Sequence, residues 1–227
     1  MMIYFVRHGE PIYDPDCLTE KGKVQANALS NRPELSQIDR IYSSSSTRAI
    51  QTAEPLAKKL GKEIEILDWC SEKYTVKEFC VDEDGKRKWL SQSENCLKVF
   101  SSNDILDRGF KWYESDVINS EKYRNGMHRI MNHTYEFLTA LGYEHDNDNH
   151  CYKAINPNDK RIALFAHSGF SKAFLSAVLD IPYPYLLHFE HDYTGVTVIE
   201  FSAYNDGFAF ARLLQHSDTS HLYVNTK

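Results

Sequence analysis

Apolar residues recur along this chain with the two spacings that distinguish strands from helices. Four short apolar runs, rich in β-branched and aromatic residues, predict strands at residues 3–6, 40–43, 63–67 and 161–166. Apolar residues at helical spacing follow three of these runs and predict helices that end near Asn31, Gly61 and Pro182. Two last strands are expected at 195–201 and 207–214. This alternation predicts an α/β fold, a three-layer sandwich around a mostly parallel sheet.

The segment from about residue 73 to residue 159 differs in composition from the rest of the chain: it is rich in polar and aromatic residues, and its apolar residues are irregularly spaced. An apolar stripe over 123–141 predicts a long helix, and shorter helices are expected near Val99 and Trp112. Residues 142–149 are expected to form an exposed loop. We therefore predict a single domain over residues 1–227, with a helical cap insertion at about 73–159.

Polar groups stand at the carboxyl ends of three predicted strands: Arg7-His8-Gly9, Ser44 to Arg48, and His167-Ser168-Gly169. Ligands of open α/β sheets bind beyond these ends, so the three groups should converge. Two histidines and two arginines there offer positive charge, hydrogen-bond donors and a nucleophilic imidazole, which suits a phosphoryl group. Two helix N-termini add backbone N–H donors. For Ser44, helix capping and phosphate contact stay equally open.

Composition and charge narrow the class of function. The chain is 42% hydrophobic and 26% charged, as is usual for a globular protein. With 26 Lys and Arg against 32 Asp and Glu, its formal charge of -6 gives no long-range attraction to nucleic acids or anionic membranes, so neither is an expected partner. The N-terminal apolar run stops at Arg7, unlike a signal peptide, and the 5 cysteines form no Cys-x-x-Cys pair. A cytoplasmic protein with reduced thiols is expected.

One polar cluster has the residue types of a metal site: His145, Asp146, Asp148 and His150. Their close spacing on a polar stretch favours solvated side chains over ligands that converge on an ion. We therefore predict no metal site there.

Four motifs occur in a fixed order along the chain. They are R-H-G-E at 7–10, L-T-x-x-G-x-x-Q-A at 18–26, S-x-x-x-R-A-x-x-T-A at 44–53, and His-Ser-Gly at 167–169 after an apolar strand. In this order they closely resemble the histidine phosphatase superfamily, also called the phosphoglycerate mutase-like family. Each motif is weak alone, whereas four in order are specific. The resemblance covers the first 70 or so residues and 161–201, but not the segment between them.

The resemblance implies a phosphomonoester hydrolase that passes through a phosphohistidine at His8 and needs neither metal nor cofactor. Arg7, Arg48 and His167 would form the phosphate pocket, with His167 also counted among the catalytic residues. A carboxylic acid after the third strand would protonate the leaving oxygen. Glu72 is the best match for this acid and Glu78 the second.

Substrate selectivity is less well defined by the resemblance. Candidate substrate contacts are Glu10, Asp14, Ser168 and His191. Asp14 stands where the family often has Asn, Ser45 where it commonly has Pro, and the Gly-rich stretch of the mutases is absent after Glu72. These departures weigh against a phosphoglycerate mutase more than against a phosphatase. A mutase-type phosphotransferase and a non-catalytic module that binds phosphorylated ligands are the alternatives to a hydrolase of a small phosphomonoester.

Overall fold

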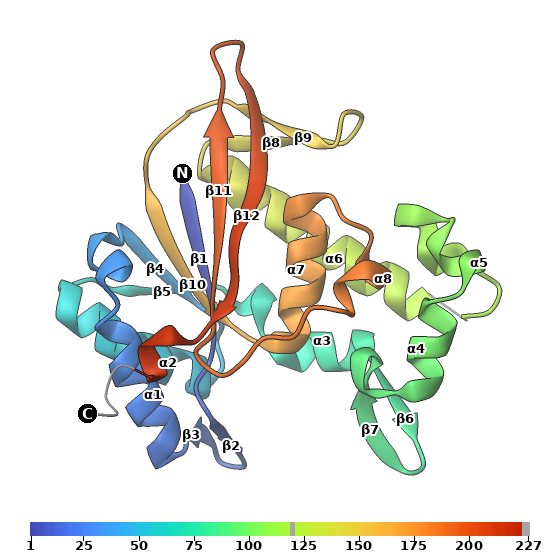
Figure 1. Ribbon diagram of the computed structural model, residues 1–227, viewed down its shortest axis with the longest axis horizontal. Coiled ribbons are helices and arrows are strands. Elements are labelled where there is room, and N and C mark those ends of the chain that lie inside the picture. The colour runs from blue at the N-terminus through green and yellow to red at the C-terminus, as the bar shows by residue number, and fades with distance from the viewer. Residues whose placement is uncertain (119–120, 224–227) are drawn as a thin grey trace.

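The computed structural model of this protein describes residues 1–118 and 121–223. Its described residues form a central sheet of eight strands with helices on both faces (Figure 1). The strands are β1 (Met2–Arg7), β4 (Arg40–Ser43), β5 (Ile64–Ile66), β8 (Tyr143–Asp146), β9 (Cys151–Ala154), β10 (Arg161–Ala166), β11 (Val196–Ala203) and β12 (Phe208–Asp218). They lie in the order β5-β4-β10-β1-β11-β12-β9-β8.

The sheet has a parallel half and an antiparallel half. Strands β5, β4, β10 and β1 are parallel neighbours, and β11 pairs antiparallel with β1. Antiparallel pairing continues through β12 and β9 to β8, so that most strands share the direction of β1. In the register of β1 and β10, Arg7 lies opposite Ala166, so the residues that follow these strands leave the sheet side by side.

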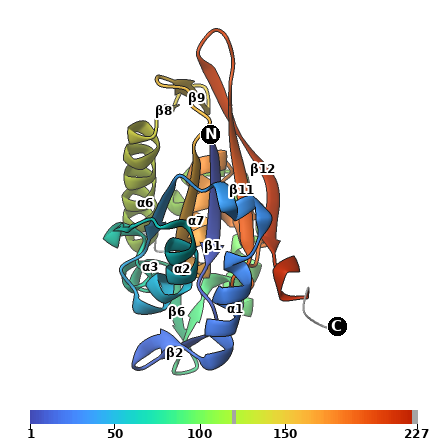
Figure 2. The same cartoon turned by 90° about the vertical axis from the view of Figure 1, so that its left-hand side faces the viewer.

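Helices cover both faces of the sheet, as the sequence predicts. They are α1 (Glu20–Ser30), α2 (Thr47–Leu60), α3 (Glu72–Phe79), α4 (Glu94–Phe100), α5 (Asn103–Leu106), α6 (Glu121–Ala140), α7 (Ser168–Leu179) and α8 (Tyr183–Leu186). Figure 2 shows α1 and α6 on opposite sides of β1. The side chains of β1 alternate accordingly: Tyr4 and Val6 belong to the apolar cluster of α1 and α2, and Phe5 stacks on Phe174 of α7.

The start of α1 explains one of the sequence motifs. The hydroxyl of Thr19 caps the helix by accepting a hydrogen bond from the backbone N–H of Gly22 at 2.9 Å. A Cβ atom on Gly22 would collide with the backbone of Glu10, and one on Gly9 would lie 2.8 Å from the Gly22 carbonyl oxygen. Both positions therefore need glycine, because the loop after His8 packs directly against the helix.

Three small hairpins complete the fold: β2 (Pro11–Tyr13) with β3 (Asp16–Leu18), β6 (Cys80–Glu83) with β7 (Lys86–Trp89), and β8 with β9. Helices α4 and α6 and a 3₁₀ turn at Gly109–Glu114 confirm the helices expected from residue 73 to 159. The exposed loop expected at 142–149 is wrong, because β8 and β9 extend the central sheet there. Tyr143 and Tyr152 are buried in this hairpin, and β9 pairs with β12. That this segment acts as a cap stays a prediction.

Two findings concern the state of the cysteines and whether any helix could span a membrane. All five cysteines lie in the described part of the chain and are free thiols, as expected. Across residues 1–118 and 121–223, every helix is too short or too polar to cross a lipid bilayer. The cytoplasmic location stays a prediction.

Candidate active site

The structure brings the three polar groups together at the carboxyl ends of β1, β4 and β10, at the lower end of β1 in Figure 1. His8 follows β1 and His167 follows β10, and their ring centroids lie 5.2 Å apart. Ser44 follows β4, and Arg48 lies in the first turn of α2. All four side chains are buried. The predicted convergence is therefore observed.

His8 is held in one tautomer. Its Nδ1 lies 2.7 Å from the carbonyl oxygen of Gly9, which can only accept, so Nδ1 carries the hydrogen and Nε2 keeps its lone pair. Arg48 donates from Nε to this Nε2 at 3.3 Å. Burial lowers the pKa of His8 to about 3, against the opposing effect of the Gly9 hydrogen bond, and the charges of Arg48 and Arg7 lower it further. The imidazole is thus neutral at pH 7, and its Nε2 lone pair accepts from Arg48.

Arg48 links the other members of the site. Its Nη2 lies 2.7 Å from Glu72 Oε2 and 3.2 Å from His167 Nδ1. Its Nη1 donates to Asp16 Oδ1 at 2.6 Å, so the β2–β3 hairpin also fixes the guanidinium. Sequence reasoning missed Asp16, because no motif marks a carboxylate in that short hairpin.

His167 and Ser44 form a second fixed pair. Arg48 can only donate, so His167 Nδ1 accepts, and His167 Nε2 carries the hydrogen that Ser44 Oγ accepts at 2.8 Å. The backbone N–H of Ser46 donates to the same oxygen at 3.2 Å. Burial holds the pKa of His167 well below its ordinary value, and the charges of His8 and of the two arginines act in the same direction. Ser44 therefore lies behind His167 and orients it, rather than facing a ligand as the phosphate-contact alternative required.

The two candidate acids take different places. Glu72 begins α3, is buried, and its Oε2 lies 3.6 Å from His167 Nδ1. Glu78, later in α3, makes a two-pronged ion pair with Arg129 of α6 at 2.6 and 2.7 Å. Glu72 is thus the carboxylate that lies among the histidines, whereas Glu78 joins two helices.

Arg7 is held at two points and leaves one donor unused. Its Nη1 donates to the carbonyl oxygen of His191, and its guanidinium carbon lies 4.0 Å from the ring centroid of Tyr193. Its Nε is buried and has no hydrogen-bond partner among the described residues. A buried donor without an acceptor costs about 1–3 kcal/mol.

A cavity of about 180 Å³ opens onto Arg7, His8 and Glu72, and Ser168 also lines it, whereas Arg48 and His167 are not among its lining residues. Sequence reasoning missed several other wall residues: Tyr13, Trp89, Lys172, Glu190 and Tyr193. The one available signal concerned Lys172, which lies four residues after Ser168 and therefore on the same face of α7.

Three of the four expected substrate contacts do not line this cavity. Glu10 pairs instead with Lys21 at 2.7 Å, and Asp14 is exposed in the turn between β2 and β3. The ring of His191 lies between Ser171 and Thr197, at 3.0 and 2.9 Å, so that only its carbonyl reaches the site through Arg7. Ser168 is therefore the expected contact that lines this cavity, and a role in substrate binding for the other three stays a prediction.

The polar cluster at 145–150 does not converge on one point. His145 and His150 contact Asp180, at 2.8 and 3.3 Å, whereas Asp146 pairs with Lys153. Among the described residues, a set of possible metal ligands within 4.8 Å of one another is formed by His8, Glu72 and His167. Arg48 already donates to the ligand atom of each of the three. In this structure the donor set thus surrounds the Arg48 guanidinium.

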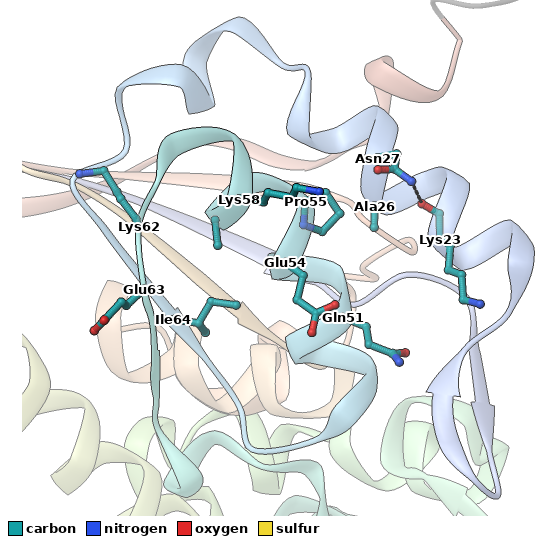
Figure 3. Close-up of a pocket in the computed structure, with 11 residues that line it drawn as sticks. Lys23, Ala26, Asn27, Gln51, Glu54, Pro55, Lys58, Lys62, Glu63 and Ile64 are labelled. Carbon is teal, nitrogen blue, oxygen red and sulfur yellow. Dashed lines mark hydrogen bonds between the residues drawn. The ribbon is translucent and has the colours of Figure 1, made fainter.

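A larger cavity, of about 880 Å³, lies away from the histidines, between α1, α2 and β5. Figure 3 shows Lys62 and Glu63 at one end of this groove and Lys23 at the other. Its polar side chains are spread along the groove, and they include no histidine or arginine. Chemistry is therefore assigned to the smaller cavity, where the reactive groups converge.

The fold and the site together define a class, α/β proteins with paired histidines and arginines at the carboxyl edge of the sheet. A sequence profile of the histidine phosphatase superfamily (branch 1) matches residues 3–79 and 152–213, more than half of the chain. The chain therefore belongs to the histidine phosphatase superfamily. No functionally curated protein sequence matches it significantly.

Solved structures of phosphatases share the fold. A phosphoserine phosphatase from Entamoeba histolytica, in complex with 3-phosphoglyceric acid, is 20% identical with a TM-score of 0.61 and covers 97% of this chain and 98% of its own. A mycobacterial glucosyl-3-phosphoglycerate phosphatase is 18% identical with a TM-score of 0.59, covering 95% and 98%. A putative α-ribazole-5′-phosphate phosphatase from Escherichia coli is 17% identical with a TM-score of 0.59, covering 96% and 97%.

Proposed function

We propose that this protein is a metal-independent phosphomonoesterase that transfers a phosphoryl group first to His8 and then to water. The observation that carries the proposal is the state of His8. Its Nδ1–H is bound to the Gly9 carbonyl, its Nε2 lone pair faces Arg48, and burial keeps the ring neutral. A neutral imidazole of fixed tautomer is ready to act as a nucleophile.

In the first step His8 Nε2 attacks phosphorus in line with the ester oxygen, and the P–O bond to the alcohol breaks. We assign the transferring oxygens to Arg7 and Arg48, while His167, whose Nε2–H is bound to Ser44 and whose Nδ1 accepts from Arg48, holds the guanidinium in place. Glu72 acts as the general acid and gives a proton to the leaving oxygen. It then takes a proton from the water that attacks the phosphohistidine, which returns His8 to its free form.

Two features support a small metabolite as the substrate. The cavity of about 180 Å³ is smaller than the roughly 300–1,000 Å³ usual for sites that hold drug-sized ligands. Proteins of the same fold include phosphatases named for phosphoserine and for glucosyl-3-phosphoglycerate. We infer a small phosphomonoester of this kind for this chain. Independence from metal is supported by Arg48, whose guanidinium contacts His8, Glu72 and His167.

The test is to trap the phosphorylated protein. Brief mixing with a ³²P-labelled phosphomonoester, followed by an alkaline quench, should leave acid-labile label on the wild type and none on His8→Ala. The matched control is His188→Ala, which removes an exposed histidine and should keep the label. Equal labelling of His8→Ala would contradict the proposal. Release of inorganic phosphate, rather than transfer to added glycerate, separates hydrolase from mutase, and binding without turnover would indicate a non-catalytic module.

A further inference from the structure

Lys172 is a buried ammonium that the mechanism above does not use. It lies in α7, lines the same cavity as His8, and is only 4% exposed. Lysine is rarely buried to this extent unless it is paired. Its one ion-pair partner among the described residues is Glu190, whose Oε1 lies 3.1 Å away and whose side chain is 66% exposed. An ion pair with one exposed carboxylate stabilises a buried ammonium only weakly, so this pair alone does not explain why Lys172 is buried.

The position of Lys172 follows from its helix. His167 caps α7, and Ser168 and Lys172, four residues apart, both face the cavity. Trp89 packs over Gly169 so closely that a Cβ atom on that glycine would collide with the indole ring. The residues that follow β7 therefore form the wall opposite α7, with Lys172 facing the space between.

The charges in the cavity leave Lys172 without a role in phosphoryl transfer. The mechanism above assigns the transferring oxygens to the two arginines and the nucleophile to His8, so it gives Lys172 no part. Burial lowers the pKa of Lys172, Glu190 opposes this, and Arg7 is close enough to add to the lowering. Two cations thus line one small cavity, and Lys172, which is paired with the exposed Glu190, is placed to meet a second anionic group.

We propose that Lys172 binds a carboxylate of the substrate, so that the preferred substrates are small phosphomonoesters that also carry a carboxylate. The inference rests on the proposed function for the phosphoryl end of the cavity. A single ammonium matches one carboxylate in charge and donates up to three hydrogen bonds. The exposed carboxylate of Glu190 occupies the place that the substrate carboxylate takes, and turns into solvent when substrate binds.

Phosphoserine and phosphoethanolamine provide a matched pair of probes, because they differ only in the carboxylate. Lys172→Met should lower the ratio of their kcat/KM values about 10- to 100-fold, the loss expected for one hydrogen bond to a charged group. Lys172→Arg, which keeps the charge, should restore most of the ratio. Glu190→Gln removes the competing carboxylate and should raise the ratio. A ratio unchanged in Lys172→Met, or lowered equally in Glu190→Gln, would overturn the proposal.

A binding measurement separates this proposal from the proposed function. In a His8→Ala background, calorimetry with 3-phosphoglycerate and with glycerol phosphate should give a preference for the former that Lys172→Met abolishes. If the wild type turns over nothing but this preference is present, the carboxylate site stands and the hydrolase proposal fails. If turnover occurs without any preference that depends on Lys172, the carboxylate site fails. Should Lys172→Met not fold, Glu190→Gln decides: a raised preference supports the site and an unchanged one overturns it.

Discussion

His8 makes the stability of this protein depend on pH in a direction that the site determines. Burial lowers its pKa from an ordinary 6.5 in the unfolded chain to about 3 in the folded protein. Between these values the unfolded chain binds a proton that the folded protein does not. The free energy of unfolding therefore falls as the pH falls through this range, and His8 contributes nothing to the pH dependence well above pH 6.5.

The size of the effect follows from the two pKa values. The whole shift corresponds to about 5 kcal/mol, reached near pH 3, and about 2 kcal/mol of it appears between pH 7 and pH 5. A loss of this size is a large part of the roughly 5–15 kcal/mol that stabilises a typical domain. His167 and His191, whose pKa values are also lowered by burial, add losses of the same sign.

A pair of urea titrations isolates the part that belongs to His8. His8→Gln has no group to protonate at this position, so its free energy of unfolding should fall about 2 kcal/mol less than that of the wild type between pH 7 and pH 5. The histidines outside the site contribute equally to both proteins and cancel in the comparison. His188→Gln, at an exposed position, should follow the wild type. The same pH dependence in wild type and His8→Gln would refute the assignment of a neutral, proton-excluding imidazole.

Two further predictions concern the chemistry. Glu72→Gln should slow cleavage of an alkyl phosphate about 10²–10⁴-fold, while a burst of p-nitrophenol from p-nitrophenyl phosphate survives, because that leaving group hardly needs a proton. Small and equal losses on the two substrates, measured by stopped flow, would give the acid role to another carboxylate. Activity should persist after incubation with EDTA, since Arg48 supplies the charge next to His8. A loss that Mg²⁺ or Zn²⁺ restores would point instead to ion binding at His8, Glu72 and His167.

The core of the site could be predicted because it depends on local patterns and one topological rule. Continuous apolar runs identified β1 and β10 as buried strands, and parallel neighbours end at the same edge of a sheet. The residues directly after each strand, His8 and His167, had to meet there. A residue directly after a strand has little freedom of placement. The sequence positions of these two histidines were therefore enough to predict where they lie in the fold.

The rest depended on contacts between distant segments, which a local pattern does not contain. The β8–β9 hairpin looks polar, and it becomes part of the sheet only because β12 pairs with β9 through Phe208 and Ala209. His191 was expected to face the site, but Ser171 and Thr197 hold its ring elsewhere. Glu10 likewise follows the histidine motif directly, yet it turns to Lys21.

The residues around the cavity also divide into those that local sequence patterns predict and those that contacts between distant segments bring in. The groups for the phosphoryl end, His8, Arg48 and His167, fall in the segments that match the superfamily profile, 3–79 and 152–213. Trp89 falls between the matched segments, and it packs on Gly169 of α7, the helix that also carries Lys172. The groups proposed for phosphoryl transfer thus lie in the shared part of the chain, whereas part of the cavity wall, at Trp89, comes from the unmatched segment. This is the physical reason why the motifs indicate the reaction but leave its substrate open.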